Sequence, residues 1–267
     1  MPIQIERSFG RQAFGADPAN YDASRPAYPD WVFESLAEHG LEPGAAVFEI
    51  GPGTGTATRP LLARGADPLV AIEPDPRLAD YLRRNTPSPA LEVRNAAFED
   101  ADLPAGAFDL GLAATSFHWL VEDEALARIA RLLKPGGWWA ALWNIFGDDS
   151  RPDPFHDATH ELLGGHPQSP GQQGNAPFGA DVAARTSALE RAGFQAIAHR
   201  MSHWPLVLSA DETVRLYATY SNVVARPDRD RELAELRRIA ETRFGGRVTR
   251  NMTTVLYLAR RRERGRA

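Results

Sequence analysis

The sequence has no cysteine and only one lysine, and each scarcity excludes a type of chemistry. Without cysteine the chain has no disulfide, no thiolate metal ligand and no cysteine nucleophile. Schiff-base chemistry would depend on Lys134 alone, which lies in a predicted Lys-Pro-Gly-Gly turn after a helix. A Gly-x-Ser-x-Gly nucleophile elbow and a P-loop lysine motif are also missing from the sequence.

Long apolar runs are absent too. The longest, near Trp138–Trp143, is too short to span a bilayer, and the first ten residues contain no apolar signal core. The formal net charge is −5, which disfavours a broad nucleic-acid-binding face. The basic stretch from Arg260 to Arg266 is the local exception. We interpret it as a solvated tail, with phosphate or membrane contact as the alternative. We therefore expect a cytoplasmic protein that binds neither nucleic acid nor membrane.

Short apolar runs alternate with amphipathic segments, which is typical of a parallel sheet with helices on both faces. The 267 residues, 43% of them hydrophobic, are enough for one α/β domain with additions. Strands are predicted near 45–50, 68–73, 90–94, 107–113, 137–143, 195–208 and 247–259, the last one antiparallel. Helices are predicted near 30–38, 56–64, 76–84, 122–133, 181–192, 211–221 and 228–243.

Two segments interrupt this alternation. The residues before the helix at 30–38 read as a polar lead, and residues 147–180 are rich in Pro, Gly, His and Gln. A loop as long as the second is usually a lid or a disordered insertion. Within it, His156 and His160 could place two imidazoles on one helix face, with His166 nearby. Because the acid follows this pair instead of lying between the two histidines, we favour a polar helix or lid and predict no metal site.

The most informative stretch begins at Val47. An apolar run containing Glu49 leads into glycines at 51, 53 and 55, which reads as a buried strand, a tight turn and the start of a helix. Glycines in such a turn let backbone N–H groups approach a ligand closely. A dinucleotide-binding Gly-x-Gly-x-x-Gly motif would need its third glycine at position 56, which is Thr56.

Glu73 ends the next apolar run, about twenty residues after the glycines. In a βαβ unit the end of the second strand lies beside a ligand held at the first turn, and an acid there can accept both ribose hydroxyl protons. We interpret Glu73 as this ribose ligand. The alternative is that Glu73 caps the following helix, a role that Asp75 could also fill.

The Glu-x-Gly-x-Gly-x-Gly pattern resembles motif I of the class I S-adenosylmethionine (SAM)-dependent methyltransferases. Phe108-Asp109-Leu110 is similar to a segment of that family's fourth strand. Phe117-His118-Trp119 resembles the Phe-His-Trp branch of small-molecule methyltransferases, similar to the trans-aconitate and UbiE-like groups. Residues 21–29 resemble the Tyr-x-x-x-Arg-Pro-x-Tyr-Pro opening of the family. Matches near 217–221 and 244–248 extend the resemblance over nearly the whole chain, although 147–180 matches nothing.

The resemblance implies a single α/β domain over 1–267, a doubly wound and mostly parallel seven-stranded sheet with its last strand antiparallel. It also implies an N-terminal flap at 1–40 and a lid insertion at 147–180. The glycines would admit the amino-acid end of SAM, and Ala97 and Phe98 would frame the adenine, with Phe98 as a plain core residue as the alternative. The implied cofactor contacts are Tyr21, Arg25, Glu49, Gly51, Pro52, Gly53, Thr54, Gly55, Glu73, Pro74, Ala97, Phe98, Thr115, Ser116, Phe117, His118 and Trp119.

Two of these residues have open roles. The planar fork of Arg25 suits a carboxylate, either that of the methionine part of SAM or that of an acidic substrate. The alternative is a surface arginine stacked on Tyr28. His118 lies beyond the carboxyl end of a predicted strand, where it would contact cofactor or substrate, and it is the candidate general base.

We therefore expect in-line transfer of the methyl group of SAM to an oxygen, nitrogen or carbon nucleophile of a small molecule. One alternative is a nucleotide-dependent oxidoreductase, which the missing third glycine disfavours. Another is a non-catalytic SAM-binding or interaction domain. Nucleic-acid methylation is disfavoured by the charge and by the lack of an Asn-Pro-Pro-Tyr/Phe motif after the fourth strand. The acceptor and the oligomeric state are not indicated by the sequence.

Overall fold

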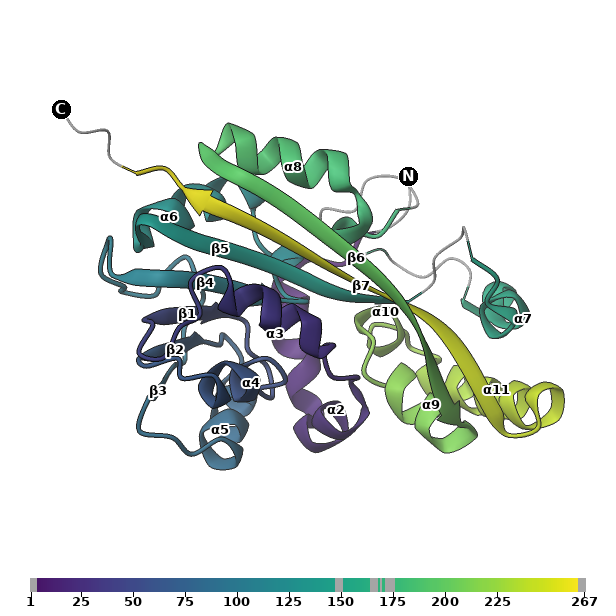
Figure 1. Cartoon of the computed structure of the whole chain (residues 1–267). Helices are drawn as coiled ribbons and strands as arrows, with labels where there is room; N and C mark the ends of the chain where they lie inside the picture. Colours follow the sequence, from purple (N-terminus) through teal and green to yellow (C-terminus); the bar gives the residue numbers. More distant parts are fainter. Residues whose placement is uncertain (1–3, 147–150, 164–167, 169, 171–175, 264–267) are drawn as a thin grey trace.

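The computed structural model describes residues 4–146, 151–163, 168, 170 and 176–263, which build a seven-stranded sheet between layers of helices (Figure 1). The strand order is β3-β2-β1-β4-β5-β7-β6. Strands β1 to β5 pair in parallel, whereas β7 runs antiparallel to both β5 and β6. The predicted fold class is confirmed, including the reversed last strand.

The strands are β1 Val47–Ile50, β2 Leu69–Ile72, β3 Leu91–Arg94, β4 Phe108–Ala114, β5 Leu133–Phe146, β6 Phe194–Ser209 and β7 Arg247–Arg261. The α-helices are α1 Arg7–Ala13, α2 Pro18–Ser24, α3 Asp30–Ala37, α4 Thr58–Ala63, α5 Pro76–Asn85, α6 Glu122–Leu132, α7 Pro154–Leu163, α8 Val182–Arg191, α9 Ala210–Tyr217, α10 Ser221–Val224 and α11 Arg229–Phe244. Short 3-10 turns are η1 Phe14–Ala16, η2 Phe117–Trp119 and η3 Phe178–Ala180.

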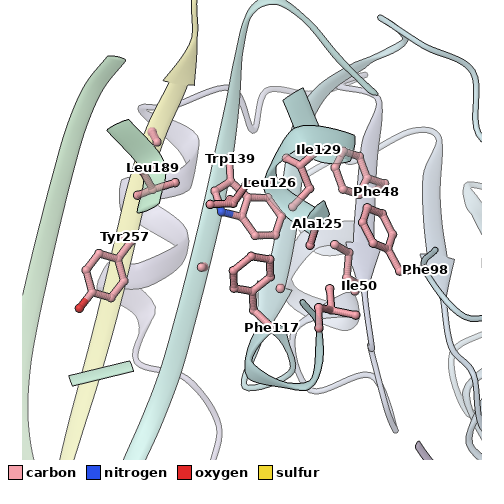
Figure 2. Packing of buried hydrophobic residues seen from close by; sticks show 14 of the residues in the cluster. Phe48, Ile50, Phe98, Phe117, Ala125, Leu126, Ile129, Trp139, Leu189 and Tyr257 are labelled. Atoms are coloured by element: carbon pink, nitrogen blue, oxygen red, sulfur yellow. The ribbon is translucent and has the colours of Figure 1, made fainter. Parts of the chain in front are cut away.

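Side-chain alternation along the strands builds two cores, one on each face of the sheet. Val47 of β1 packs with α3 and α4, whereas its neighbour Phe48 packs with α6 and α8 on the opposite face. Figure 2 shows the second core, in which Phe48, Phe117 and Trp139 lie close to Leu126 of α6. Because β1 is buried on both faces, it reads as a continuous apolar run interrupted only by Glu49.

A third core joins α7, α9, α10 and α11 to the first half of β7, at one end of the long β6–β7 pair (Figure 1). Phe155, Tyr217 and Leu236 are buried there. Beside them lies a buried ion pair, in which Arg250 Nε is 2.8 Å from a carboxylate oxygen of Asp153. This helical group therefore has its own apolar packing and its own fixed charges.

The structure corrects the expectation for the first irregular segment, because the polar lead before residue 30 contains α1 and α2. The segment at 147–180, for which a polar helix or a lid was expected around His156 and His160, contains α7 and η3. The carboxylates of Asp17 and Asp153 accept hydrogen bonds from backbone N–H groups in the first turns of α2 and α7, and proline follows each acid. The helix predicted at 211–221 is α9, but it ends earlier than predicted, at Tyr217, and the separate short helix α10 begins at Ser221.

Lys134 has a structural role near the starts of the strands. Helix α6 ends at Leu132 and β5 begins at Leu133, so Lys134 belongs to the strand and not to a separate turn. Its ammonium lies 2.8 Å from both carboxylate oxygens of Asp109. Asp109 also accepts a hydrogen bond from the backbone N–H of Ala46, which ties the starts of β1, β4 and β5 together.

Candidate active site

A cavity of about 1080 Å³, including its mouth, opens at the carboxyl ends of β1, β2 and β4. In an open α/β sheet these strand ends are where ligands bind. The N-terminal segment forms the outer wall through Gly10, Phe14, Tyr21 and Arg25. The first forty residues therefore contribute directly to a site that the sheet positions.

The glycine turn after β1 has the backbone conformation that its sequence predicts. Gly51 has φ 63° and Gly53 has φ 59°, in the left-handed region that favours glycine. A Cβ atom at Gly51 would lie 2.7 Å from Cβ of Ser116, and one at Gly53 would point into the cavity, 4.0 Å from the Tyr21 ring. Both positions therefore keep the cavity floor free of side chains.

Glu73 lies at the end of β2 and is only 4% exposed. Its two carboxylate oxygens accept hydrogen bonds from the backbone N–H groups of Gly53 and Asp75, each at 3.0 Å. Asp75 caps α5 by accepting from the N–H of Arg77 at 2.9 Å. The cap is therefore Asp75, and the Glu73 carboxylate is left to line the cavity beside the glycine turn.

The structure brings most of the predicted contact residues together around this first cavity. Those that line it are Tyr21, Arg25, Glu49, Gly51, Pro52, Gly53, Glu73, Pro74, Ala97, Phe98, Thr115, Ser116 and Trp119. Phe98 also belongs to the core, where it stacks on Phe48 with ring centroids 6.2 Å apart. Four predicted residues lie elsewhere: Thr54 and Gly55 turn toward Arg59, Phe117 is buried in the core, and His118 lines a second cavity.

Residues 48–141 match the family model described as "Methyltransferase domain". The match runs from β1 into β5 and includes the strand ends and loops that form the floor of the first cavity. Residues 48–141 therefore carry a methyltransferase domain.

Two relatives of this methyltransferase domain are proteins of uncharacterised activity. An uncharacterised methyltransferase-like protein of Schizosaccharomyces pombe is 30% identical over 157 residues, which are 57% of this chain and 58% of the relative. An uncharacterised methyltransferase of Mycobacterium tuberculosis is 33% identical over 136 residues, 49% of this chain and 52% of the relative. The chain thus spans a little over half the length of the curated relatives it matches.

Solved structures extend the likeness in fold to nearly the whole chain. A protein of Anaeromyxobacter dehalogenans, provisionally named a type II methyltransferase, superposes with a TM-score of 0.64 at 23% identity, covering 90% of this chain and 99% of that one. At 23% identity, the superposition shows that the two chains share a fold. Because it covers 90% of the chain, it extends well beyond residues 48–141.

The first cavity of the methyltransferase domain fits SAM, the cofactor of this family, because it contains a buried hydrogen-bond acceptor that lacks a donor in the described part of the chain. Glu49 is 1% exposed; one carboxylate oxygen accepts a 2.6 Å hydrogen bond from Thr58, and the other has no partner among the described residues. A buried acceptor without a donor is costly, and the ammonium group of a bound amino acid would satisfy it. Glu49 and Glu73 thus offer hydrogen-bond acceptors to a cationic nucleoside. The glycine turn gives the cavity a floor without side chains.

Burial raises the pKa of Glu49 to about 7, and the nearby charge of Glu73 adds to the shift while Thr58 opposes it. Burial also raises the pKa of Glu73 to about 7, against the hydrogen bonds from Asp75 and Gly53. The two carboxyl groups therefore change charge near neutral pH while the cavity is free of ligand.

A second cavity adjoins the first and shares residues with it, including Tyr21, Arg25, Thr115 and Asn144. It lies between the methyltransferase domain and the helical group. Its other walls include Trp143, Phe146, Phe178, Tyr217, Tyr220 and Arg250. The described part of its lining contains no aspartate or glutamate, whereas the first cavity is lined by Glu49, Glu73 and Glu99.

Arg25 separates the two cavities. Its guanidinium lies 4.9 Å from the ring centroid of Tyr21 and 5.0 Å from that of Tyr220, and it donates to the carbonyl of Thr219 at 2.8 Å. Its Nε is buried and has no partner among the described residues. The surface arginine stacked on Tyr28 is therefore not what the structure shows. The rings that sandwich Arg25 are those of Tyr21 and Tyr220.

His118 lines the second cavity at η2. The indole N–H of Trp143 donates to His118 Nδ1 over 3.2 Å. Burial, followed by the charge of Arg25, lowers the pKa of His118 to about 4. His118 is therefore neutral near pH 7, and the accepted hydrogen bond leaves the proton on Nε2.

Several features of the site were not expected from the sequence. Thr115 has φ 55°, a strained conformation for a β-branched residue, and is held by a 2.8 Å hydrogen bond to the hydroxyl of Tyr28. Trp143 and Phe178 come from β5 and η3, and only the fold brings them beside His118. The Tyr28 contact was recoverable, because the Tyr-x-x-x-Arg-Pro-x-Tyr motif includes it.

The described residues give no support to the other site chemistries. His156 and His160 do lie on one helix with ring centroids 6.0 Å apart, but no group of three potential metal ligands occurs in the described part of the chain. His166 falls outside the described residues. Among the helices that the structure describes, none has the length and apolar character to cross a membrane.

Proposed function

We propose that this protein transfers a methyl group from SAM to a small-molecule acceptor. The observation that carries the proposal is the pair of joined cavities, one with the glycine turn and Glu73, the other with aromatic walls. Bound in the first, SAM would supply a sulfonium methyl that an acceptor nucleophile takes as the carbon–sulfur bond breaks, leaving S-adenosylhomocysteine (SAH). The shared wall at Arg25 and Thr115 would place the acceptor beside the cofactor.

The protein's own part would be alignment and exclusion of water. Glu73 would hold the ribose, Glu49 the ammonium group, and Ala97 with Phe98 the adenine. Positioning can supply much of the rate of such a displacement, because it converts an encounter in solution into a reaction between held partners. A nucleophile that is ionised at neutral pH would need no general base.

We further propose that the N-terminal and insertion segments close these cavities. Residues 1–40 would act as a flap, since Phe14, Tyr21 and Arg25 wall the first cavity from outside. Residues 147–180 would act as a lid on the acceptor, since His156 and Phe178 line the second cavity. Both segments would belong to a single domain over 1–267.

The sheet argues against an oxidoreductase. Dinucleotide-binding sheets of the Rossmann type are parallel in the order 3-2-1-4-5-6, whereas here the antiparallel β7 lies between β5 and β6. Thr56 also stands where the third glycine would be. A non-catalytic SAM-binding domain has the same first cavity, so only turnover separates it from an enzyme.

The test of the proposed function is transfer from deuteromethyl-labelled SAM. The purified protein is incubated with labelled SAM and a panel of small acids, phenols and amines, and products are detected by mass spectrometry. We expect SAH to accumulate together with an acceptor that gains the labelled methyl group. SAM binding without a labelled product from any acceptor would favour the non-catalytic domain.

Affinity for SAM should rise with pH between 6 and 8. SAM carries a net positive charge, so it favours the ionised forms of Glu49 and Glu73, whose pKa values near 7 make both largely protonated at pH 6. We expect a change of about tenfold for each carboxyl group that SAM keeps ionised, measured by calorimetry across this range. In Glu49→Gln the rise should be smaller, and an unchanged slope would contradict the assignment.

The free protein should show the opposite trend in stability. The pKa values of Glu49 and Glu73 in the folded state exceed the ordinary value of 4.5, so folding favours their protonated forms. The stability that they contribute is complete below pH 4.5 and is lost as the pH rises through about 7. Urea unfolding of the wild type and of Glu49→Gln at pH 6 and 8 would measure this difference.

A further inference from the structure

We infer that the second cavity selects a flat acceptor carrying a carboxylate, which Arg25 and His118 recognise. This inference rests on the proposed methyl transfer and specifies the substrate class of the same site. It begins with the separation of charge between the two cavities. Three glutamates and the shared Arg25 line the first cavity, whereas the described lining of the second contains Arg25, Arg250 and no acid.

Of the two arginines in the second cavity, one is already neutralised. Arg250 is 2% exposed and pairs with the equally buried Asp153 at 2.8 Å. Arg25 has no carboxylate partner among the described residues; it contacts two tyrosine rings and one carbonyl, and its Nε has no acceptor. The guanidinium of Arg25, in a partly buried wall, therefore has N–H groups left to donate. A carboxylate matches it in charge and in planar geometry.

His118 adds a neutral donor to the same cavity. Trp143 donates to Nδ1, which fixes the tautomer that carries its proton on Nε2. No described residue forms a hydrogen bond with Nε2, and the ring lines the second cavity. An imidazole held in this tautomer presents an N–H group to an oxygen of the acceptor instead of removing a proton from it. Trp143 is then a positioning residue for His118.

The walls define the body of the ligand. Trp143, Phe146, Phe178 and Tyr220 line the second cavity, and Tyr217 lies beneath Tyr220 with ring centroids 4.9 Å apart. Aromatic side chains arranged in this way favour flat, apolar groups over branched or highly hydroxylated ones. The ligand that satisfies both the walls and the donors is a small aromatic or conjugated carboxylic acid.

The experiment compares acids with their neutral amides on the SAH-bound protein. Benzoate, cinnamate and 2-naphthoate, each beside its amide, are titrated by calorimetry into protein saturated with SAH. We expect at least one acid to bind at least about tenfold more tightly than its amide. With the protein saturated with SAH, Arg25→Gln should abolish that preference, while Arg25→Lys should keep part of it. His118→Phe should weaken the acid about fivefold.

Matched controls and a spectroscopic readout make the outcomes distinct. Arg84→Gln removes an exposed arginine on α5 and should leave the preference intact. Nitrogen NMR of the histidines should show His118 as the Nε2–H tautomer, and Trp143→Phe should release that constraint. Equal binding of acids and amides, no binding of any acid, or an Arg25→Gln defect confined to SAH would overturn the inference. A wild type that does not bind SAH would instead refute the proposed function.

Discussion

Replacing Glu73 by alanine should weaken SAH binding about 100-fold while leaving the protein folded. The Glu73 carboxylate is buried at the cavity floor and is the acid best placed to accept the two ribose hydroxyls. Hydrogen bonds to a charged group contribute about 1.5–3 kcal/mol each, so losing them accounts for a change of this size. Calorimetric titration at pH 8, where the wild-type carboxylate is ionised, measures it directly.

Two further variants sharpen this result. Glu73→Gln keeps the size of the side chain but replaces one acceptor oxygen by a donor, so it should also bind SAH weakly. Glu124→Gln changes an exposed acid of α6 and should bind SAH like the wild type. If Glu73→Ala retained wild-type affinity with a normal melting curve, the ribose would have to bind elsewhere.

Asp153→Ala should lower the free energy of unfolding by about 3–5 kcal/mol, the largest stability effect that we expect from removing one charge. It leaves the buried guanidinium of Arg250 without its carboxylate partner, in a pocket formed by Phe146, Phe155 and Tyr217. It also removes the acceptor for the first turn of α7 and for the N–H of Asn251. Urea unfolding measures the loss.

The control for this effect is an ion pair of the same type at the surface. Asp123 lies 3.0 Å from Arg191, and both side chains are more than half exposed, so Asp123→Ala should cost less than about 1 kcal/mol. The double variant Asp153→Ala/Arg250→Met removes both buried charges and should recover part of the stability. Equal losses from Asp153→Ala and Asp123→Ala would show that the buried pair does not anchor the helical group.

The sequence predicts the sheet and the first cavity well because both depend on local patterns. The apolar run at Val47, the glycines after it and the acid at Glu73 each lie within one βαβ unit, where spacing along the chain fixes spacing in the fold. For the cap of the following helix, the sequence left only two candidates, the nearby acids Glu73 and Asp75. The structure resolves this choice through hydrogen bonds that spacing alone does not determine.

The helices missed in the irregular segments had a signal that composition obscured. Asp17-Pro18, Asp75-Pro76 and Asp153-Pro154 each place a capping acid before a proline at the first helical position. The second was expected to begin a helix, because an apolar stripe follows it. Helix α2 lies in a polar segment where no helix was expected. Helix α7 lies in a segment rich in proline and glycine, where a polar helix was one of two interpretations and its first residue was not predicted.

The contacts around His118 in the second cavity were beyond sequence reasoning for a physical reason. His118, Trp143 and Phe178 come from three separate elements, and the hydrogen bond that fixes the His118 tautomer joins residues 25 positions apart. The strained backbone of Thr115 likewise depends on a contact with Tyr28, 87 residues away. Such constraints arise from tertiary packing, so no local pattern reports them.

We expect the first cavity to bind both SAM and its product SAH. The most direct test is calorimetric titration of the wild-type protein with SAH and, separately, with NADH under the same conditions. We predict one site per chain for SAH, with a dissociation constant at or below about 10 μM, and no measurable binding of NADH. Binding of NADH alone, or of neither compound, would contradict the claim.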